Sequence, residues 1–143
     1  MRVEIKLSAD IKEPYAVIYT DEITEEISKI NACLKNSEQV ITAYEEESIV
    51  ILKREDIYML RANERKVSIF GSSKEYTSKK CLYEFEELLT KDFMRISKAT
   101  IINLSHIKRV EPSFNGMLVV MENGCKDYIS RKYLPEFKKY LGL

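Results

Sequence analysis

Basic side chains stand at the ends of the predicted strands in the second half of the chain. An Arg guanidinium at the rim of a rigid sheet can pair with O6 and N7 of guanine, while neighbouring Lys side chains neutralise phosphates. Basic residues also populate the turns of soluble proteins, so their spacing alone fits either a nucleic-acid contact or a solvated turn. The cations concerned are Arg65, Lys66, Arg95, Lys98, Lys108, Arg109, Arg131 and Lys132.

The net charge of zero hides two halves of opposite sign. Residues 1–47 contain five Lys or Arg and eleven Asp or Glu, a net charge of −6. Residues 48–143 contain eighteen Lys or Arg and twelve Asp or Glu, a net charge of +6. Because a basic module attracts phosphate, the second half is the better candidate for binding a nucleic acid.

Residues for catalysis or metal binding are scarce. His106 is the one histidine, and Cys33, Cys81 and Cys125 lie more than forty residues apart, which predicts reduced thiols and no zinc site. The acidic run 45–47 could bind a metal, but consecutive carboxylates between two strands more often form a solvated turn. The sequence contains no GxGxxG, Walker, GxSxG or HExxH motif. We therefore expect no enzymatic activity and no cofactor.

Length and composition are those of a globular protein. The chain has 143 residues, of which 32% are charged and 45% hydrophobic, enough for about one domain with a core. No apolar run reaches the roughly 18 residues of a membrane helix, and the N-terminal sequence lacks the apolar stretch of a secretory signal. We therefore expect a cytoplasmic protein without membrane insertion.

The first part of the chain should form two strands and a helix. Residues 3–7 alternate between polar and apolar, and residues 15–19 are aromatic and β-branched, so both predict strands. A helix is predicted over residues 20–36, with Thr20 or Asp21 as N-cap and acidic residues in its first turn. Its apolar stripe is expected to pack on the two strands and consists of Ile23, Ile27, Ile30 and Leu34.

Residues 39–143 should form a mainly β module. Short β-branched segments separated by polar turns predict antiparallel hairpins, with Asn123-Gly124 as the clearest tight turn. One short amphipathic helix is predicted over 81–90, and residues 133–143 predict one or two helical turns interrupted by Pro135. The predicted strands and hairpins lie at 39–53, 56–71 with its turn at 62–65, 74–79, 93–97, 100–104, 107–112 and 117–130.

The segment 93–103, FMRISKATIIN, resembles the central motif of the LytTR DNA-binding family. In that motif an F-x-R strand leads through a polar turn to a hydrophobic pair and Asn. Further elements agree in order with the family's D-I-x-Y strand, its L-x-x-x-E-x-x-L helix, the isoleucine after the Asn, its hairpin turn and its S-R-x-Y segment. They are Asp56-Ile57-Tyr58, residues 82–89, Ile107, Asn123-Gly124 and Ser130-Arg131-Lys132-Tyr133.

The resemblance covers residues 39–143 and implies a fold of the α+β class that is mainly β. The expected architecture is an elongated antiparallel β-sheet module with one short helix, preceded by a small acidic β-β-α unit at residues 1–38. Members of the family bind DNA through loops, without a recognition helix. Two protomers usually occupy a direct repeat, which implies a homodimer on double-stranded DNA.

Roles of individual side chains are carried over by position in the family's motifs. The resemblance assigns base contacts to Lys98, Arg131, Lys66 and Arg65. Asn103 follows two apolar residues, and its amide is expected to hold a turn through backbone hydrogen bonds, with DNA contact as the alternative. Phosphate contact or support is assigned to Arg95, Ser97, Lys108, Arg109 and Lys132.

Two departures from the family's pattern limit what the resemblance implies. Ser97 stands where many members have His, and Ala99 where they have Ser. The resemblance therefore does not imply which DNA sequence the protein binds. The 38 residues before the module are too few for a receiver domain, so we expect no control by aspartyl phosphorylation within the chain. That unit is expected to dimerise, to dock a regulatory protein partner or to extend the core.

Two functions remain at this point. The favoured one is a stand-alone bacterial transcriptional regulator that binds specific DNA sequences by placing loop side chains in major grooves. The alternative is a protein-interaction or sensing module on a similar β scaffold that does not bind DNA. Affinity that falls steeply with salt would distinguish the regulator, because binding to phosphates releases condensed counterions.

Overall fold

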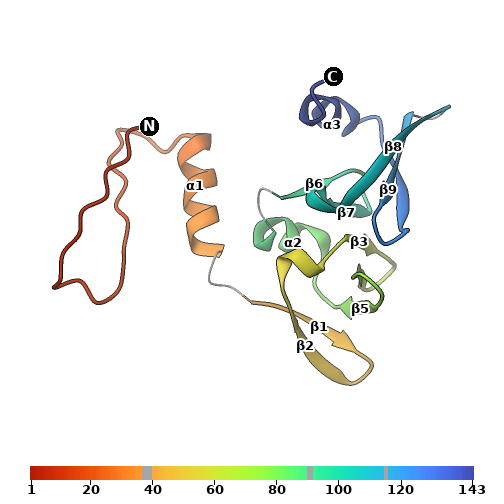
Figure 1. Cartoon of the computed structure of the whole chain (residues 1–143), viewed down its shortest axis with the longest axis horizontal. Coiled ribbons are helices and arrows are strands. Elements are labelled where there is room, and N and C mark those ends of the chain that lie inside the picture. Colours follow the sequence, from red (N-terminus) through yellow and green to blue (C-terminus); the bar gives the residue numbers. More distant parts are fainter. Residues whose placement is uncertain (37–39, 90–91, 115) are drawn as a thin grey trace.

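The first part of the chain is extended and ends in a helix. The computed structural model describes residues 1–36, 40–89, 92–114 and 116–143, and the predicted boundary between residues 38 and 39 lies outside them. Residues 1–24 contain no strand or helix, and helix α1 (Glu25–Asn36) follows (Figure 1). The strands predicted at 3–7 and 15–19 are therefore wrong. The two segments run alongside each other, but no backbone hydrogen bond joins them, and a strand requires such bonds.

Helix α1 begins later than predicted. Thr24, rather than Thr20 or Asp21, precedes its first turn, and the Thr24 hydroxyl accepts a hydrogen bond from the Ile27 amide at 3.3 Å. This contact satisfies one of the amides that a helix N-terminus leaves without an intrahelical partner. The Thr20 hydroxyl instead donates to the Glu22 carbonyl at 2.7 Å, within the extended segment.

The apolar stripe of α1 is only partly covered. Ile27 and Ile30 are half-buried, whereas Ile23 is 81% and Leu34 52% exposed. The prediction that two strands would cover this stripe is wrong, because residues 1–24 do not form a sheet. An apolar surface is thus left at the N-terminal part of the molecule.

Seven antiparallel strands form the larger sheet, in the order β2-β1-β5-β4-β3-β7-β6. Each hairpin turns at a polar segment, as the sequence predicts. The seven-stranded order places β7, the strand after the F-x-R segment, between β3 and the edge strand β6. The strands are β1 (Ile41–Glu45), β2 (Ser48–Leu52), β3 (Met59–Ala62), β4 (Val67–Phe70), β5 (Glu75–Ser78), β6 (Phe93–Arg95) and β7 (Thr100–Asn103).

Helix α2 (Leu82–Leu88) completes the core of this sheet. Its Phe85 is fully buried in one cluster with Leu60, Ile69 and Ile101 from three strands. Burying a side chain of this size stabilises the fold by about 1.5–3 kcal/mol. The helix therefore shares one apolar core with the larger sheet.

Three antiparallel strands form the smaller sheet, in the order β10-β9-β8. They are β8 (Ile107–Ser113), β9 (Gly116–Met121) and β10 (Lys126–Ile129). The predicted tight turn at Asn123-Gly124 is confirmed, and Gly124 has a φ of +91°, a conformation that glycine adopts without steric cost. Met121 and Ile129 pack with Phe137 of helix α3 (Leu134–Tyr140) in a second core.

Helix α3 corrects the prediction for the C-terminal segment. Pro135 lies in the first helical turn instead of interrupting it, because a helix leaves that position without an amide bond to lose. The described part of the module therefore contains two α-helices, not one, while its α+β, mainly β class is confirmed. Among the described residues, no helix is long and apolar enough to cross a membrane.

Candidate DNA interface

Three loops from distant parts of the chain meet at one edge of the module. The Ala62 amide, at the start of the turn between β3 and β4, donates to the Ala99 carbonyl at 2.7 Å. The Ser130 amide, directly after β10, donates to the Ile96 carbonyl at 2.8 Å. The turn at 96–99 therefore lies between the other two loops. This arrangement brings Lys98 between the loop of Arg65 and Lys66 and the segment that carries Arg131.

Hydrogen bonds from Arg95 hold the turn that carries Lys98. The Arg95 guanidinium donates to the carbonyl of Ser97 at 3.1 Å and to that of Lys98, and it forms an ion pair with Glu86 at 2.6 Å. The Ser97 hydroxyl accepts from the Ala99 amide at 3.2 Å. Arg95 is largely buried, with 23% of its side chain exposed, whereas Lys98 is exposed. Arg95 thus supports the turn, and Lys98 is presented by it.

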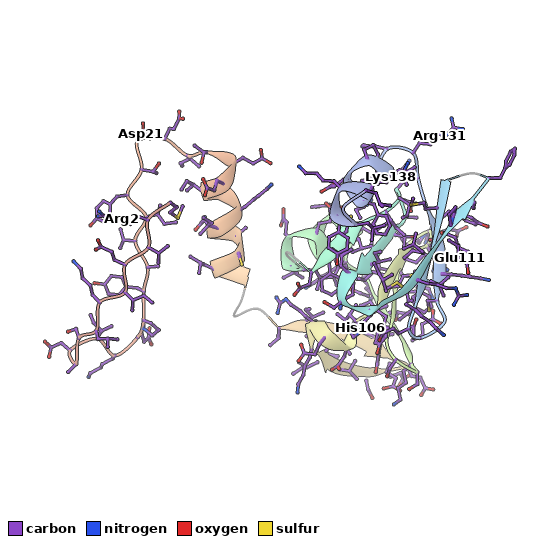
Figure 2. The ribbon with its side chains drawn as sticks, turned by 45° about the horizontal axis from the view of Figure 1, so that its top comes forward. Arg2, Asp21, His106, Glu111, Arg131 and Lys138 are labelled. Atoms are coloured by element: carbon purple, nitrogen blue, oxygen red, sulfur yellow. The ribbon has the colours of Figure 1, made fainter. Side chains whose placement is uncertain are left out.

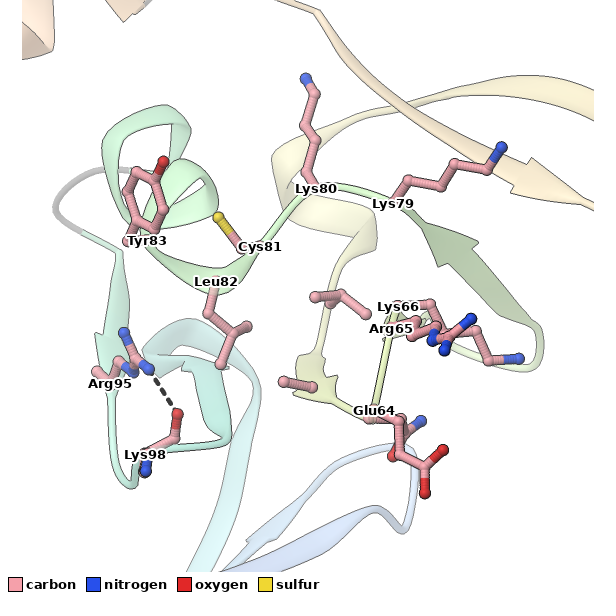
Figure 3. Close-up of a pocket in the computed structure, with 13 residues that line it drawn as sticks. Glu64, Arg65, Lys66, Lys79, Lys80, Cys81, Leu82, Tyr83, Arg95 and Lys98 are labelled. Atoms are coloured by element: carbon pink, nitrogen blue, oxygen red, sulfur yellow. Dashed lines mark hydrogen bonds between the residues drawn. The ribbon is translucent and has the colours of Figure 1, made fainter.

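A basic groove of about 380 Å³ runs beside this turn. Lys79 and Lys80, between β5 and α2, were not among the candidates from the sequence. The ladder explains their position, because Val67 of β4 pairs with Ser78 of β5 and thereby places Lys66 opposite Lys79. Figure 3 shows the cations around the groove, and they are Arg65, Lys66, Lys79, Lys80, Arg95 and Lys98.

Arg131 and Lys132 follow β10 on the other side of the Lys98 turn. Both are exposed, and Figure 2 places Arg131 at the periphery of the molecule near α3. The Tyr133 amide donates to the Ser130 carbonyl at 3.0 Å, which fixes the turn that contains both cations. The Lys132 ammonium lies 5.5 Å from the centre of the Tyr133 ring, within the range of a cation–π contact.

Lys108 and Arg109 lie apart from the three loops. They belong to β8, which β9 separates from β10. Arg109 pairs with Val120, three residues along β9 from the partner of Ile129, and its guanidinium lies 2.6 Å from the Glu111 carboxylate. The structure therefore does not bring these two candidates into the basic groove.

Asn103 is enclosed by backbone. It is 2% exposed, its amide nitrogen donates to the Ile57 carbonyl at 2.8 Å, and its amide oxygen accepts from the Ser105 amide at 3.0 Å. These bonds link β7 to two short 3-10 helices, η1 (Arg54–Asp56) and η2 (Leu104–His106). The contacts are those that a structural role of Asn103 requires.

Arg61, Thr100 and Asp127 form a polar cluster that joins the two sheets and that the sequence does not reveal. We call this cluster the polar tie. Asp127 of β10 accepts from the Thr100 hydroxyl at 2.6 Å and forms an ion pair with Arg61 at 3.3 Å. The Arg61 guanidinium also donates to the Lys126 carbonyl at 3.0 Å. Thr100 directly follows the Lys98 turn, so this tie fixes that turn relative to the strand that leads to Arg131.

Metal and redox chemistry receive no support from the described part of the chain. No group of three His, Cys, Asp or Glu side chains there could hold a metal ion. Cys33, Cys81 and Cys125 are free thiols, and burial raises the pKa of the Cys125 thiol. A raised pKa leaves less of the reactive thiolate at neutral pH.

Comparisons with known proteins identify the family of the chain. The sequence model of the LytTr DNA-binding domain matches residues 47–142. The chain is 36% identical over 100 residues to the sensory transduction protein LytT of Enterococcus faecalis, a match that covers 68% of this chain and 41% of that protein. It is 24% identical over 146 residues to an uncharacterized HTH-type transcriptional regulator of Staphylococcus aureus (strain NCTC 8325 / PS 47), covering 100% of this chain and 99% of that regulator.

A solved structure resembles the module as well. It is a LytTr DNA-binding domain from Bacillus cereus, with a TM-score of 0.68 and 30% sequence identity. The match covers 74% of this chain and 99% of that one. Sequence and fold thus agree, and the chain belongs to the LytTR family of DNA-binding domains.

Proposed function

We propose that this protein is a transcriptional regulator that recognises a specific DNA sequence with side chains from the three loops around Lys98. The observation that carries the proposal is the backbone contact of the Lys98 turn with the Ala62 loop on one side and with Ser130 on the other. Cations from three loops then face one ligand together. A DNA duplex, with its regular row of phosphates and its base edges, is a ligand that such a surface fits.

The exposed cations divide between two tasks in this proposal. Lys98 and Arg131 contact base edges, together with Arg65 and Lys66, because these side chains lie at the tips of loops that can enter a major groove. The newly located Lys79 and Lys80, with Lys132, neutralise phosphates. Arg95 and Ser97 support the Lys98 turn, and Lys108 and Arg109 reach phosphates outside the groove.

The assembly on DNA and the place of action belong to the same proposal. Two protomers bind a direct repeat as a homodimer, so that each reads one half-site. The protein acts in the cytoplasm, where its DNA target lies. The family resemblance supports both points.

Selection of bound genomic fragments by the purified protein, followed by affinity measurements across a salt series, tests the proposal. With about six phosphate contacts, the affinity should fall on the order of 10³-fold between about 50 and 200 mM salt. As a control, Lys53→Ala should bind with the affinity of the wild type, because Lys53 is exposed and lies outside the groove. Retention of no fragment at low salt would overturn DNA binding as the function.

A further inference from the structure

An apolar surface at the N-terminal part of the chain is left open to solvent. Its residues alternate along the two extended segments of residues 1–24, so within each segment they share one side. Each is between 60% and 95% exposed. We call this surface the apolar ribbon, and its residues are Met1, Val3, Ile5, Leu7, Tyr15, Val17 and Tyr19.

The opposite side of the second segment already has a neighbour. Ala16, Ile18 and Thr20 border a hollow that Ile27 and other residues of α1 complete. The apolar ribbon is therefore not the side that packs on the helix of its own chain. Figure 1 shows the two segments beside α1, on the far side of that helix from the two sheets.

The backbone of the ribbon is also without partners. Among the described residues, no backbone hydrogen bond is made by residues 3–7 or 15–19. Unpaired amide and carbonyl groups along an extended segment are a template for pairing with another strand. The ribbon thus presents both apolar side chains and open hydrogen-bonding groups to an incoming chain.

The size of the ribbon exceeds what a monomer usually exposes. Aromatic side chains each offer about 150–250 Å² and aliphatic ones less, so the seven side chains, each at least 60% exposed, together expose on the order of 1,000 Å². The largest apolar patch on a typical monomer is about 300–600 Å². A stable protein interface buries about 800 Å² on each partner, an area that the ribbon can supply alone.

We propose that the apolar ribbon is a homodimerisation surface, on which the ribbon of a second copy pairs about a two-fold axis. A two-fold interface requires one patch that is complementary to itself. The ribbon meets this condition because it contains no charged residue, so two copies bury no like charges. The alternating Arg2, Glu4 and Lys6 carry both signs on the other side of the first segment. The two-fold axis relates only the paired ribbons, because a direct repeat orients the two DNA-binding modules alike. The inference rests on the homodimer of the proposed function and deepens it, but its test needs no DNA.

The test is the mass of the full-length protein in solution without DNA, measured by sedimentation over a wide range of concentrations. The wild type should be a dimer, and Ile5→Glu should weaken the dimer at least about 100-fold, because it buries a carboxylate in an apolar interface. Ile5 is 86% exposed in one chain, so this change should leave the melting temperature of the module unaltered.

Ile49→Glu is the matched control. Ile49 is a 66% exposed isoleucine on β2, outside the ribbon, and its substitution should leave the dimer intact. Loss of the dimer in Ile49→Glu with retention in Ile5→Glu would overturn the proposal and locate the interface on β2. A wild type that stays monomeric, or that associates only with a different protein, would overturn it as well.

Backbone pairing has its own measurement. Amide hydrogens of residues 3–7 and 15–19 should exchange more slowly as the protein concentration rises, and this protection should be absent in Ile5→Glu. Fast exchange in a proven dimer would exclude pairing through the ribbon. A dimer that binds no DNA would disprove the proposed function and leave this inference intact.

Discussion

Two cations three residues apart have opposite environments in this protein. Arg95 uses its guanidinium on carbonyls of the turn and on Glu86, whereas the exposed Lys98 is carried by that turn. A planar guanidinium with several donors can hold two carbonyls and a carboxylate at once, and an ammonium cannot do so in the same geometry. At the residue scale, charge alone therefore does not identify the side chains that contact DNA.

Lys98→Ala and Arg131→Ala should each cost about 1–3 kcal/mol of DNA-binding free energy and relax the preference for particular bases, because a base contact discriminates among sequences. Lys79→Ala is the control within the same groove. It should weaken all sequences about equally, since phosphates are the same at every base pair. Competition binding with single-base variants of the selected site measures both effects. Unchanged selectivity in Arg131→Ala would show that its assignment to a base contact is wrong.

Arg95→Lys should lower DNA affinity by roughly tenfold although it keeps the charge, because the Lys98 turn loses its bonds to the guanidinium. Arg2→Lys is the matched control, since the exposed Arg2 lies outside the groove and its pair with Glu4 tolerates an ammonium. Faster hydrogen exchange of the Ala99 amide in Arg95→Lys would demonstrate the loosened turn. Equal affinities of Arg95→Lys and wild type would contradict a supporting role.

At the scale of elements, the side-chain amide of Asn103 joins β7, η1 and η2. Asn103 ends β7, and its side chain reaches the Ile57 carbonyl after η1 and the Ser105 amide in η2. The stacked rings of Tyr58 and His106, with centroids 3.9 Å apart, close the same junction. The motif position of Asn103 therefore coincides with the junction of β7, η1 and η2.

Asn103→Ala should lower the free energy of unfolding by about 2–3 kcal/mol, because it removes the hydrogen bonds to the buried Ile57 carbonyl and to the part-buried Ser105 amide. Denaturant unfolding measures the loss, and Asn31→Ala on the exposed surface of α1 serves as the control. DNA affinity measured well below the melting temperature should change little. A large loss of affinity with unchanged stability would instead indicate that Asn103 touches DNA.

At the scale of the whole molecule, the sequence predicted the hairpins of the module but not how they meet. The turn between β3 and β4 and the polar turn before β7 follow from local patterns of polar and β-branched residues. Contacts such as the bond of Asp127 to Thr100 connect residues far apart in the chain and have no local signal. The register of β4 and β5, which brings Lys79 opposite Lys66, is likewise a property of the folded sheet.

At the N-terminal segments, the sequence predicted strands that the structure does not contain. Alternation at residues 3–7 correctly indicates a surface with one apolar side, but it does not supply the partner that turns an extended segment into a strand. Within one chain no such partner is present among the described residues, and Leu7 and Tyr19 remain 95% and 94% exposed. A periodic pattern thus predicts which side of a segment needs to be buried, and not what buries it.

The polar tie between the sheets has a consequence for evolution of the target site. Lys98 belongs to the seven-stranded sheet, whereas Arg131 follows the three-stranded one, and Arg61 and Asp127 hold the two sheets together. If Lys98 and Arg131 contact bases as proposed, the number of base pairs between their contacts depends on how the two sheets are joined, through this ion pair and the apolar core that both sheets share. A homologue could recognise different bases through substitutions in one loop. Recognition of bases at a different spacing would require a change in the distance between the two sheets.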